Sequence, residues 1–270
     1  MPLGYVTRSS LCRLCAGRYS LCRNITLGET MRSNARRALA LTAIAFAGLA
    51  AAPAKAENFA FMLAANNDIG VLGLSSGSFK LCGNPGVSLT GLGYGPGPVL
   101  FSAGRITSSL YTINRTNGAA TQVATSNITF LDLGSTVGGH LYALDTSLGL
   151  YRVDPTTGAA TLIGPTGLGT GGTIAMSSGS RKLYMSQNDA LYALNLKKGT
   201  AKLVGNGTVP FGAIVRMANR WYGGSNDSSP SLYSISIANG ADTLIAPLSG
   251  ESSNFWGLAP TPKTNRGVCQ

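Results

Sequence analysis

The stretch LYRVDPTTGAATLIG, residues 150–164, decides the fold because its pattern recurs along the chain. Further copies begin at Leu110, Leu191 and Leu232, and a degenerate copy begins at Ile69. Each copy has one glycine in its central turn, and the five are Gly77, Gly118, Gly158, Gly199 and Gly240. Their spacings are 41, 40, 41 and 41 residues, so the sequence predicts a repeat protein.

Each copy predicts an antiparallel pair of strands. The alternating Leu-Tyr-x-Val half is rich in β-branched and aromatic residues, and the glycine allows a tight turn before the chain returns. A further strand precedes each pair, as at His140–Ala143, and a small, glycine-rich strand precedes that one, as at Thr129–Leu133. Four strands in about forty residues are typical of a β-propeller blade.

The two ends of the repeat region complement each other. The first copy lacks an inner strand before Ala60, whereas the last copy is followed by the unmatched strand-like segment Asn254–Pro260. Pairing of these pieces would cover an open sheet edge and prevent fraying. The sequence therefore predicts an all-β protein, a five-bladed β-propeller of four-stranded blades over residues 57–260. It would be closed 1 + 3 by the C-terminal strand and followed by a tail, residues 261–270.

This repeat pattern resembles that of secreted bacterial β-propeller repeat proteins of unassigned function, and it is distantly similar to NHL and PQQ-type repeats. The resemblance spans nearly all of residues 57–260, but its motif residues are turn and core positions. It implies a fold and a compartment and leaves the ligand open. PQQ-type repeats carry a tryptophan after the turn glycine, where this chain has Leu162, Val204 or Ile245. We therefore expect no quinone, and no other cofactor.

Residues 31–56 have the layout of a secretory signal peptide. Arg32, Arg36 and Arg37 precede an uncharged, alanine-rich stretch, and Ala54-Lys55-Ala56 is a small-x-small cleavage motif. Pro53 and the weak hydrophobicity argue against a membrane anchor. We expect a periplasmic or secreted protein with no membrane insertion after cleavage. Residues 1–30 would be a non-translated or disordered leader, with translation starting at Met31.

The charge pattern changes once these segments are set aside. The full chain of 270 residues has a formal net charge of +11, which would ordinarily suggest a nucleic-acid partner. From Glu57 onward there are 13 basic and 9 acidic residues, so the net charge falls to +4. We therefore expect no nucleic-acid partner, and we expect a monomer.

Candidate ligand-binding residues are few. Asn and Asp recur in the turns between the second and third strands, where they could bind a cation or sugar hydroxyls, although such residues are also ordinary turn formers. Trp256 would lie near the channel mouth, with either a sugar-stacking or a packing role. Tyr111, Tyr151, Tyr192 and Tyr233 share one repeat position and are expected to pack between blades. The candidate set is Asn67, Asp68, Asp132, Asp189, Asp227 and Trp256.

Catalytic residues are scarce in this sequence. Asp132 is the acidic residue of the expected inner strands, and one carboxylate cannot be both proton donor and nucleophile of a glycosidase. His140 is the one histidine, which excludes a multi-histidine metal site and disfavours a catalytic triad. We expect a non-catalytic binding or scaffold propeller for a protein or carbohydrate ligand, with no metal. The alternative is a polysaccharide-acting hydrolase or lyase with its site at the propeller channel.

Cys82 and Cys269 are the two cysteines that follow the cleavage motif. An even pair in an exported protein favours a disulfide. Cys82 ends the outer strand of the first blade, and the nine residues after Pro260 are long enough to cross that blade. The sequence predicts a Cys82–Cys269 bond that clamps the ring closure.

Overall fold

The computed structural model describes residues 57–262 and 267–269, and these residues form an all-β fold with twenty strands. The expected signal peptide and leader lie outside the described residues. The described part contains no helix long and apolar enough to cross a membrane.

The strands fall into five antiparallel groups of four. The first group joins both ends of the chain and consists, in pairing order, of β20 (Phe255–Pro260), β1 (Phe59–Ala64), β2 (Ile69–Gly73) and β3 (Phe79–Gly83). The second consists of β4 (Leu89–Tyr94), β5 (Leu100–Gly104), β6 (Ser109–Ile113) and β7 (Ala120–Thr125). The third consists of β8 (Phe130–Thr136), β9 (Leu141–Asp145), β10 (Gly149–Val153) and β11 (Ala160–Pro165).

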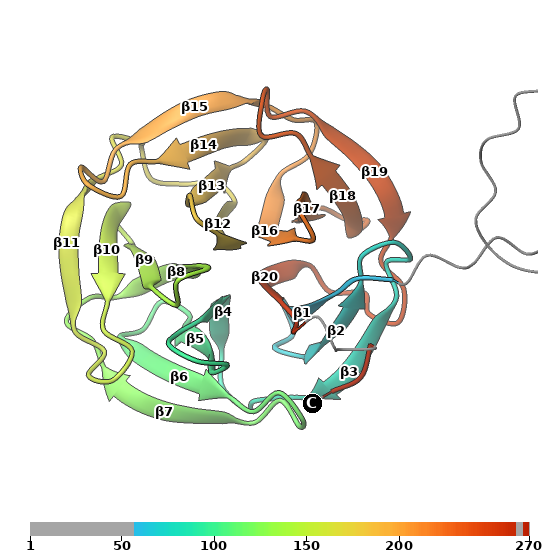
Figure 1. Cartoon of the computed structure of the whole chain (residues 1–270), viewed down its shortest axis with the longest axis horizontal. Helices are drawn as coiled ribbons and strands as arrows, with labels where there is room; N and C mark the ends of the chain where they lie inside the picture. The colour runs from blue at the N-terminus through green and yellow to red at the C-terminus, as the bar shows by residue number, and fades with distance from the viewer. Residues whose placement is uncertain (1–56, 263–266, 270) are drawn as a thin grey trace, which may run out of the picture. The chain divides into compact units, whose positions relative to one another are not determined.

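The last two groups have the same order. The fourth consists of β12 (Ile174–Ser180), β13 (Tyr184–Gln187), β14 (Ala190–Leu194) and β15 (Ala201–Asn206). The fifth consists of β16 (Phe211–Met217), β17 (Arg220–Ser225), β18 (Ser231–Ile235) and β19 (Asp242–Pro247). In Figure 1 the first strand of each group lies near a common centre and the fourth lies at the perimeter.

The repeat glycines occupy the turns between the third and fourth strands. Gly77, Gly118, Gly158, Gly199 and Gly240 all have a positive φ, between 68° and 81°. Backbone in this region favours glycine, which has no Cβ to collide with the following carbonyl. The spacing of 40 or 41 residues therefore reflects one hairpin that is repeated five times.

The ends of the chain meet in the first group. β20 pairs antiparallel with β1, from Ala60 opposite Pro260 to Ala64 opposite Phe255. A disulfide joins Cys82, in β3, to Cys269, with their Cα atoms 5.5 Å apart. Hence the C-terminal strand supplies the inner strand of the first group, and the tail is bonded to its outer strand, as the sequence predicts.

Some inner strands of neighbouring groups lie close enough to form backbone bridges with one another. β12 forms short parallel bridges with β8 and β16, which merges the last three groups into one twelve-stranded sheet. Small residues allow this approach: a Cβ on Gly134 of β8 would lie 2.5 Å from the carbonyl oxygen of Ser177 in β12. The sequence did not predict these parallel contacts.

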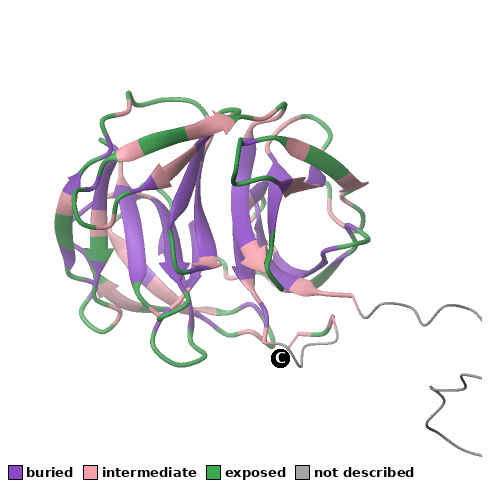
Figure 2. Cartoon of the chain, turned by 45° about the horizontal axis from the view of Figure 1, so that its top comes forward, coloured by how far each residue is buried: buried purple, intermediate pink, exposed green. Residues whose placement is uncertain are grey.

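Side-chain burial follows the distance from the centre. Inner and second strands are almost wholly buried, whereas fourth strands consist mainly of intermediate and exposed residues (Figure 2). The four repeat tyrosines each pack, partly buried, against one of the apolar clusters between groups, as expected. The core is therefore shared between neighbouring groups and not enclosed within each one.

Candidate functional site

The starts of the five inner strands surround one end of the central axis, and their last residues surround the other end. Each inner strand contributes a residue near its start to one cavity and one or more residues near its end to another. We call these the strand-start mouth and the strand-end mouth. Between them, the Ser178 hydroxyl of β12 donates a hydrogen bond to the Leu92 carbonyl of β4, across the axis. The two cavities are therefore separate candidate sites.

The strand-start mouth holds a cavity of about 160 Å³. Each inner strand contributes one lining residue, and these are Thr90, Leu131, Ile174, Gly212 and Trp256. Gly172, Thr173, Asn226 and Arg105 complete the lining. The wall thus combines one indole, one guanidinium, two hydroxyls and one carboxamide.

Arg105 and Trp256 face each other at this mouth although they lie far apart in the sequence. The Arg105 guanidinium carbon lies 4.5 Å from the centroid of the Trp256 ring, within the range of a cation–π contact. The next residue, Ile106, has a φ of +52° and is 54% exposed. A β-branched residue in the left-handed region is uncommon, and such residues cluster at ligand sites.

The turns between second and third strands surround this mouth together with the loops that link the groups. The Asn188 side chain accepts the Thr173 N–H at 3.1 Å, and the Asn226 N–H donates to the Pro210 carbonyl at 2.8 Å. The Asn226 carboxamide also donates to the Thr173 hydroxyl at 3.2 Å. These bonds hold Thr173 and Asn226 beside one another on the cavity wall.

The Asn and Asp residues predicted as ligand-binding in these turns accept hydrogen bonds from their own turn or from a neighbouring loop. Asn67 Oδ1 accepts the Leu89 N–H, and Asp68 Oδ1 accepts the Asn84 carboxamide at 2.9 Å. Asp227 Oδ1 accepts the Ser229 N–H, and the Asp189 main-chain carbonyl accepts the Gly207 N–H. These residues shape the rim but do not line the cavity.

Asp132 lies inside the protein, on β8, and is 3% exposed. Its Oδ1 accepts the Leu133 N–H at 2.7 Å, and its Oδ2 accepts the Met176 N–H of β12 at 2.6 Å. Burial raises the pKa of this carboxyl group to about 8, against the hydrogen bonds from Met176 and Leu133, which lower it. Both oxygens thus accept main-chain hydrogen bonds, one within β8 and one from the neighbouring inner strand β12.

Of the six predicted residues, the structure brings Trp256 to the cavity wall. Asn226 lies next to the predicted Asp227, in a turn that the repeat pattern had already placed on this face. Arg105 and Thr90 carry no sequence pattern that points to a site. Phe211 and Phe255, the first residues of β16 and β20, are no more than 2% exposed, so they belong to the core.

A metal centre is not formed by the residues that the structure describes. Among residues 57–262 and 267–269, no group of three or more His, Cys, Asp or Glu side chains is placed to hold a metal ion. His140 instead lies 2.9 Å, through Nδ1, from a guanidinium nitrogen of Arg152.

Comparison with solved structures supports a propeller-like architecture. The chain is similar to a chain in the crystal structure of a nidogen/laminin complex, with a TM-score of 0.51 and 10% identity, over 75% of this chain and 97% of that one. It is also similar to a structural genomics protein of unknown function from Bacteroides thetaiotaomicron, with a TM-score of 0.55 and 14% identity, over 75% of this chain and 61% of that one. No family model and no curated protein sequence matches. At such identities the likeness shows the fold alone, and that fold is all-β and β-propeller-like.

Proposed function

We propose that this chain is a five-bladed β-propeller, closed 1 + 3, that acts as an exported, non-catalytic binding module. The five groups of four strands and the pairing of β20 with β1 support the blade count and the closure. The signal-peptide layout of residues 31–56 supports export. The Cys82–Cys269 disulfide adds to this support, because such bonds persist mainly in oxidising compartments.

The ligand that the strand-start mouth fits best is a carbohydrate end group. The observation that carries this assignment is the cavity wall itself, where Trp256 stands beside the polar side chains of Thr90, Thr173 and Asn226. An aromatic ring can cover the apolar face of a sugar, while hydroxyl and carboxamide groups hydrogen-bond its hydroxyls. Arg105 adds further donors at the rim.

A protein partner is the second candidate ligand for the same face. One of the similar structures is that of a nidogen/laminin complex, so a comparable fold occurs in a complex between proteins. The loops around the strand-start mouth also present Asp68, Asp189 and Asp227 side chains, which are intermediate to exposed. These loops could contact a protein surface around the cavity.

The alternative function, a polysaccharide hydrolase or lyase, has less support. Both oxygens of Asp132 accept main-chain hydrogen bonds, and the group is almost fully buried. A glycosidase needs two carboxyl groups facing a shared substrate position. An enzyme of this kind would lose activity on substitution of Asp132 or Asp189 by asparagine while it kept its fold.

A glycan array with the purified, labelled protein tests the proposal. We expect a defined set of glycans to bind, and we expect Trp256→Phe and Asn226→Ala to weaken binding at least tenfold. Asn219→Ala, on the strand-end mouth, is the matched control and should bind like the wild type.

The outcomes separate the two ligand classes. If no glycan binds, the carbohydrate assignment is wrong, and capture of an envelope protein that Asn226→Ala prevents would then assign the face to a protein. Equal glycan binding by the wild type, Trp256→Phe and Asn226→Ala would place the glycan elsewhere and contradict the site.

A further inference from the structure

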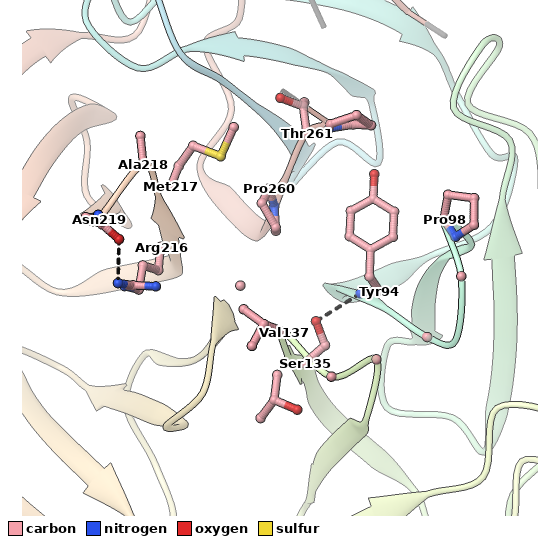
Figure 3. Close-up of a pocket in the computed structure, with 17 residues that line it drawn as sticks. Tyr94, Pro98, Ser135, Val137, Arg216, Met217, Ala218, Asn219, Pro260 and Thr261 are labelled. Atoms are coloured by element: carbon pink, nitrogen blue, oxygen red, sulfur yellow. Dashed lines mark hydrogen bonds between the residues drawn. The ribbon is translucent and has the colours of Figure 1, made fainter. Parts of the chain in front are cut away.

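The strand-end mouth holds a second and larger cavity, of about 650 Å³ (Figure 3). It is lined by the ends of all five inner strands, among them Tyr94 of β4, Ser135 of β8, Arg216 of β16 and Pro260 of β20. Its volume lies within the range of about 300–1,000 Å³ that is typical of sites for small molecules. The repeat pattern of the sequence gave no reason to expect a site here.

The charged side chain that lines this cavity is positive. Arg216 lines it, and its lining includes no aspartate or glutamate. Within the described part of the chain, Arg216 has no ion-pair partner; its guanidinium Nη2 donates to the neutral Asn219 Oδ1 at 2.8 Å (Figure 3). Since a guanidinium has five N–H donors, this bond orients the group and leaves its charge uncompensated.

The turn that carries Asn219 is held in an uncommon conformation. Ala218 and Asn219 connect β16 to β17, with φ values of +48° and +65°. The left-handed region costs a residue such as alanine about 1–2 kcal/mol, whereas asparagine enters it readily. The two-residue turn with positive φ at both positions closes the hairpin tightly and brings Asn219 back over Arg216.

The wall opposite Arg216 combines apolar groups with two hydroxyl groups. Tyr94, Pro98 and Val137 line it together with Ser135 and Thr136, and Val137 is 57% exposed. The main chain of Tyr94 is held to β8, because its N–H donates to the Ser135 hydroxyl oxygen at 2.9 Å (Figure 3). An exposed valine beside an aromatic ring offers contact to the body of a ligand.

The acidic group of a neighbouring cavity is already engaged. Glu57 lines a neighbouring cavity together with Ala218 and Arg220. Its Oε1 accepts hydrogen bonds from Ser75 and Ser76, which lower the pKa of Glu57 although burial acts in the opposite direction. Arg181 and Lys182, in the turn between β12 and β13, add positive charge on the same side of the inner strands.

We propose that the strand-end mouth is a second binding site, for a small molecule with one anionic head group and an apolar body. The carboxylate or phosphate head would bind the Arg216 guanidinium, which Asn219 positions, and the body would lie against Tyr94 and Val137. A guanidinium fork matches both kinds of head group. This site lies at the other end of the axis from the carbohydrate site and does not depend on it.

Titration calorimetry of the purified protein with benzoate, phenyl phosphate and benzamide tests the proposal. Benzamide has the same ring and nearly the same shape as benzoate but no charge. We expect at least one of the two anions to bind tenfold or more tightly than benzamide, and the stronger anion identifies the head group.

Variants then locate the site. Arg216→Gln should remove the preference for the anion, and Asn219→Ala should reduce it about threefold or more. Arg181→Gln, which removes a charge from the same face outside the cavity, is the matched control and should keep the preference; circular dichroism checks that each variant folds. The proposal is overturned if benzamide binds as tightly as the anions, if none of the three binds, or if Arg181→Gln and Arg216→Gln have equal effects.

Discussion

Asp132 is the residue whose role changes most between sequence and structure. In the sequence it is the acidic residue of the expected inner strands and hence a candidate ligand group. In the structure its carboxyl group joins β8 to β12 through the N–H group of Met176 and also accepts the N–H group of Leu133 within β8. A residue type alone cannot distinguish these roles, because the distinction depends on which main-chain donors the neighbouring strand brings within reach.

The raised pKa of Asp132 predicts how stability depends on pH. The folded-state pKa of about 8 lies above the ordinary value of 3.8, so between these values the folded protein holds a proton that the unfolded chain has released. The contribution of this group to stability is therefore fully present below about pH 4 and declines as the pH rises towards 8.

Urea unfolding at a series of pH values checks this prediction against Asp132→Asn, which is neutral at every pH. We expect the free energy of unfolding of the wild type, relative to that of the variant, to fall as the pH rises from about 4 to about 8. The same pH dependence in both proteins would show that Asp132 does not titrate in this way.

At the residue level, the positions of some candidate residues can be predicted from the sequence. The repeat pattern fixes which turns share a face, so it places Trp256 near the mouth and the Asn and Asp turns on its rim. Arg105 could not be predicted, since its contact with Trp256 is made across the junction between the first and second strand groups. No spacing in the sequence brings these two side chains together.

At the scale of elements, the hairpins could be predicted and the packing of the inner strands could not. The turn glycines and alternating strands give local patterns with a known geometry. The parallel bridges of β12 with β8 and β16 depend on how closely three backbones approach one another. That approach follows from small residues at positions that become neighbours after folding.

Gly134→Ala tests this close approach. The added methyl group would lie 2.5 Å from the Ser177 carbonyl oxygen, so β8 and β12 must move apart. We expect a loss of about 1–3 kcal/mol in the free energy of unfolding, as for other overpacked positions. Chemical denaturation measures this loss.

Gly169→Ala is the matched control for that measurement. An added Cβ at Gly169 would meet nothing within 4 Å, and this glycine does not have a positive φ. Its free energy of unfolding should therefore change by no more than about 0.5 kcal/mol. Equal changes in the two variants would argue against tight packing of the inner strands.

At the scale of the whole molecule, charge differs between the two mouths. Besides Arg105, the turns and loops around the strand-start mouth carry Asp68, Asp189, Asp227 and Glu251. Besides Glu57, the strand-end side carries Arg181, Lys182, Arg216 and Arg220. The net charge of +4 from Glu57 onward conceals this separation. Composition alone could exclude a strongly basic surface but could not reveal two faces with different preferences.

The Cys82–Cys269 bond predicts a further property of the whole ring. It links residues 187 positions apart and attaches the segment after β20 to β3. In the chain-entropy account, a cross-link over such a long loop stabilises the folded state by about 2–4 kcal/mol. We expect the Cys82→Ser, Cys269→Ser double variant to lose about this amount in urea unfolding.

A reductant provides the internal control for the disulfide. Dithiothreitol should lower the urea midpoint of the wild type towards that of the double variant and leave the variant unchanged. A double variant as stable as the oxidised wild type would mean that pairing of β20 with β1 alone holds the two ends of the fold together.

Ligand binding at the strand-start mouth is the central claim, and the fluorescence of Trp256 tests it most directly. The chain has two tryptophans, and Trp221 is 6% exposed and packs edge-on against Tyr184. Trp221→Phe keeps an aromatic ring there and leaves Trp256 as the sole indole. On titration with a glycan selected by the array, we predict a saturable change in Trp256 emission and weaker quenching by acrylamide. A glycan that binds while Trp256 emission and quenching stay unchanged would contradict the account.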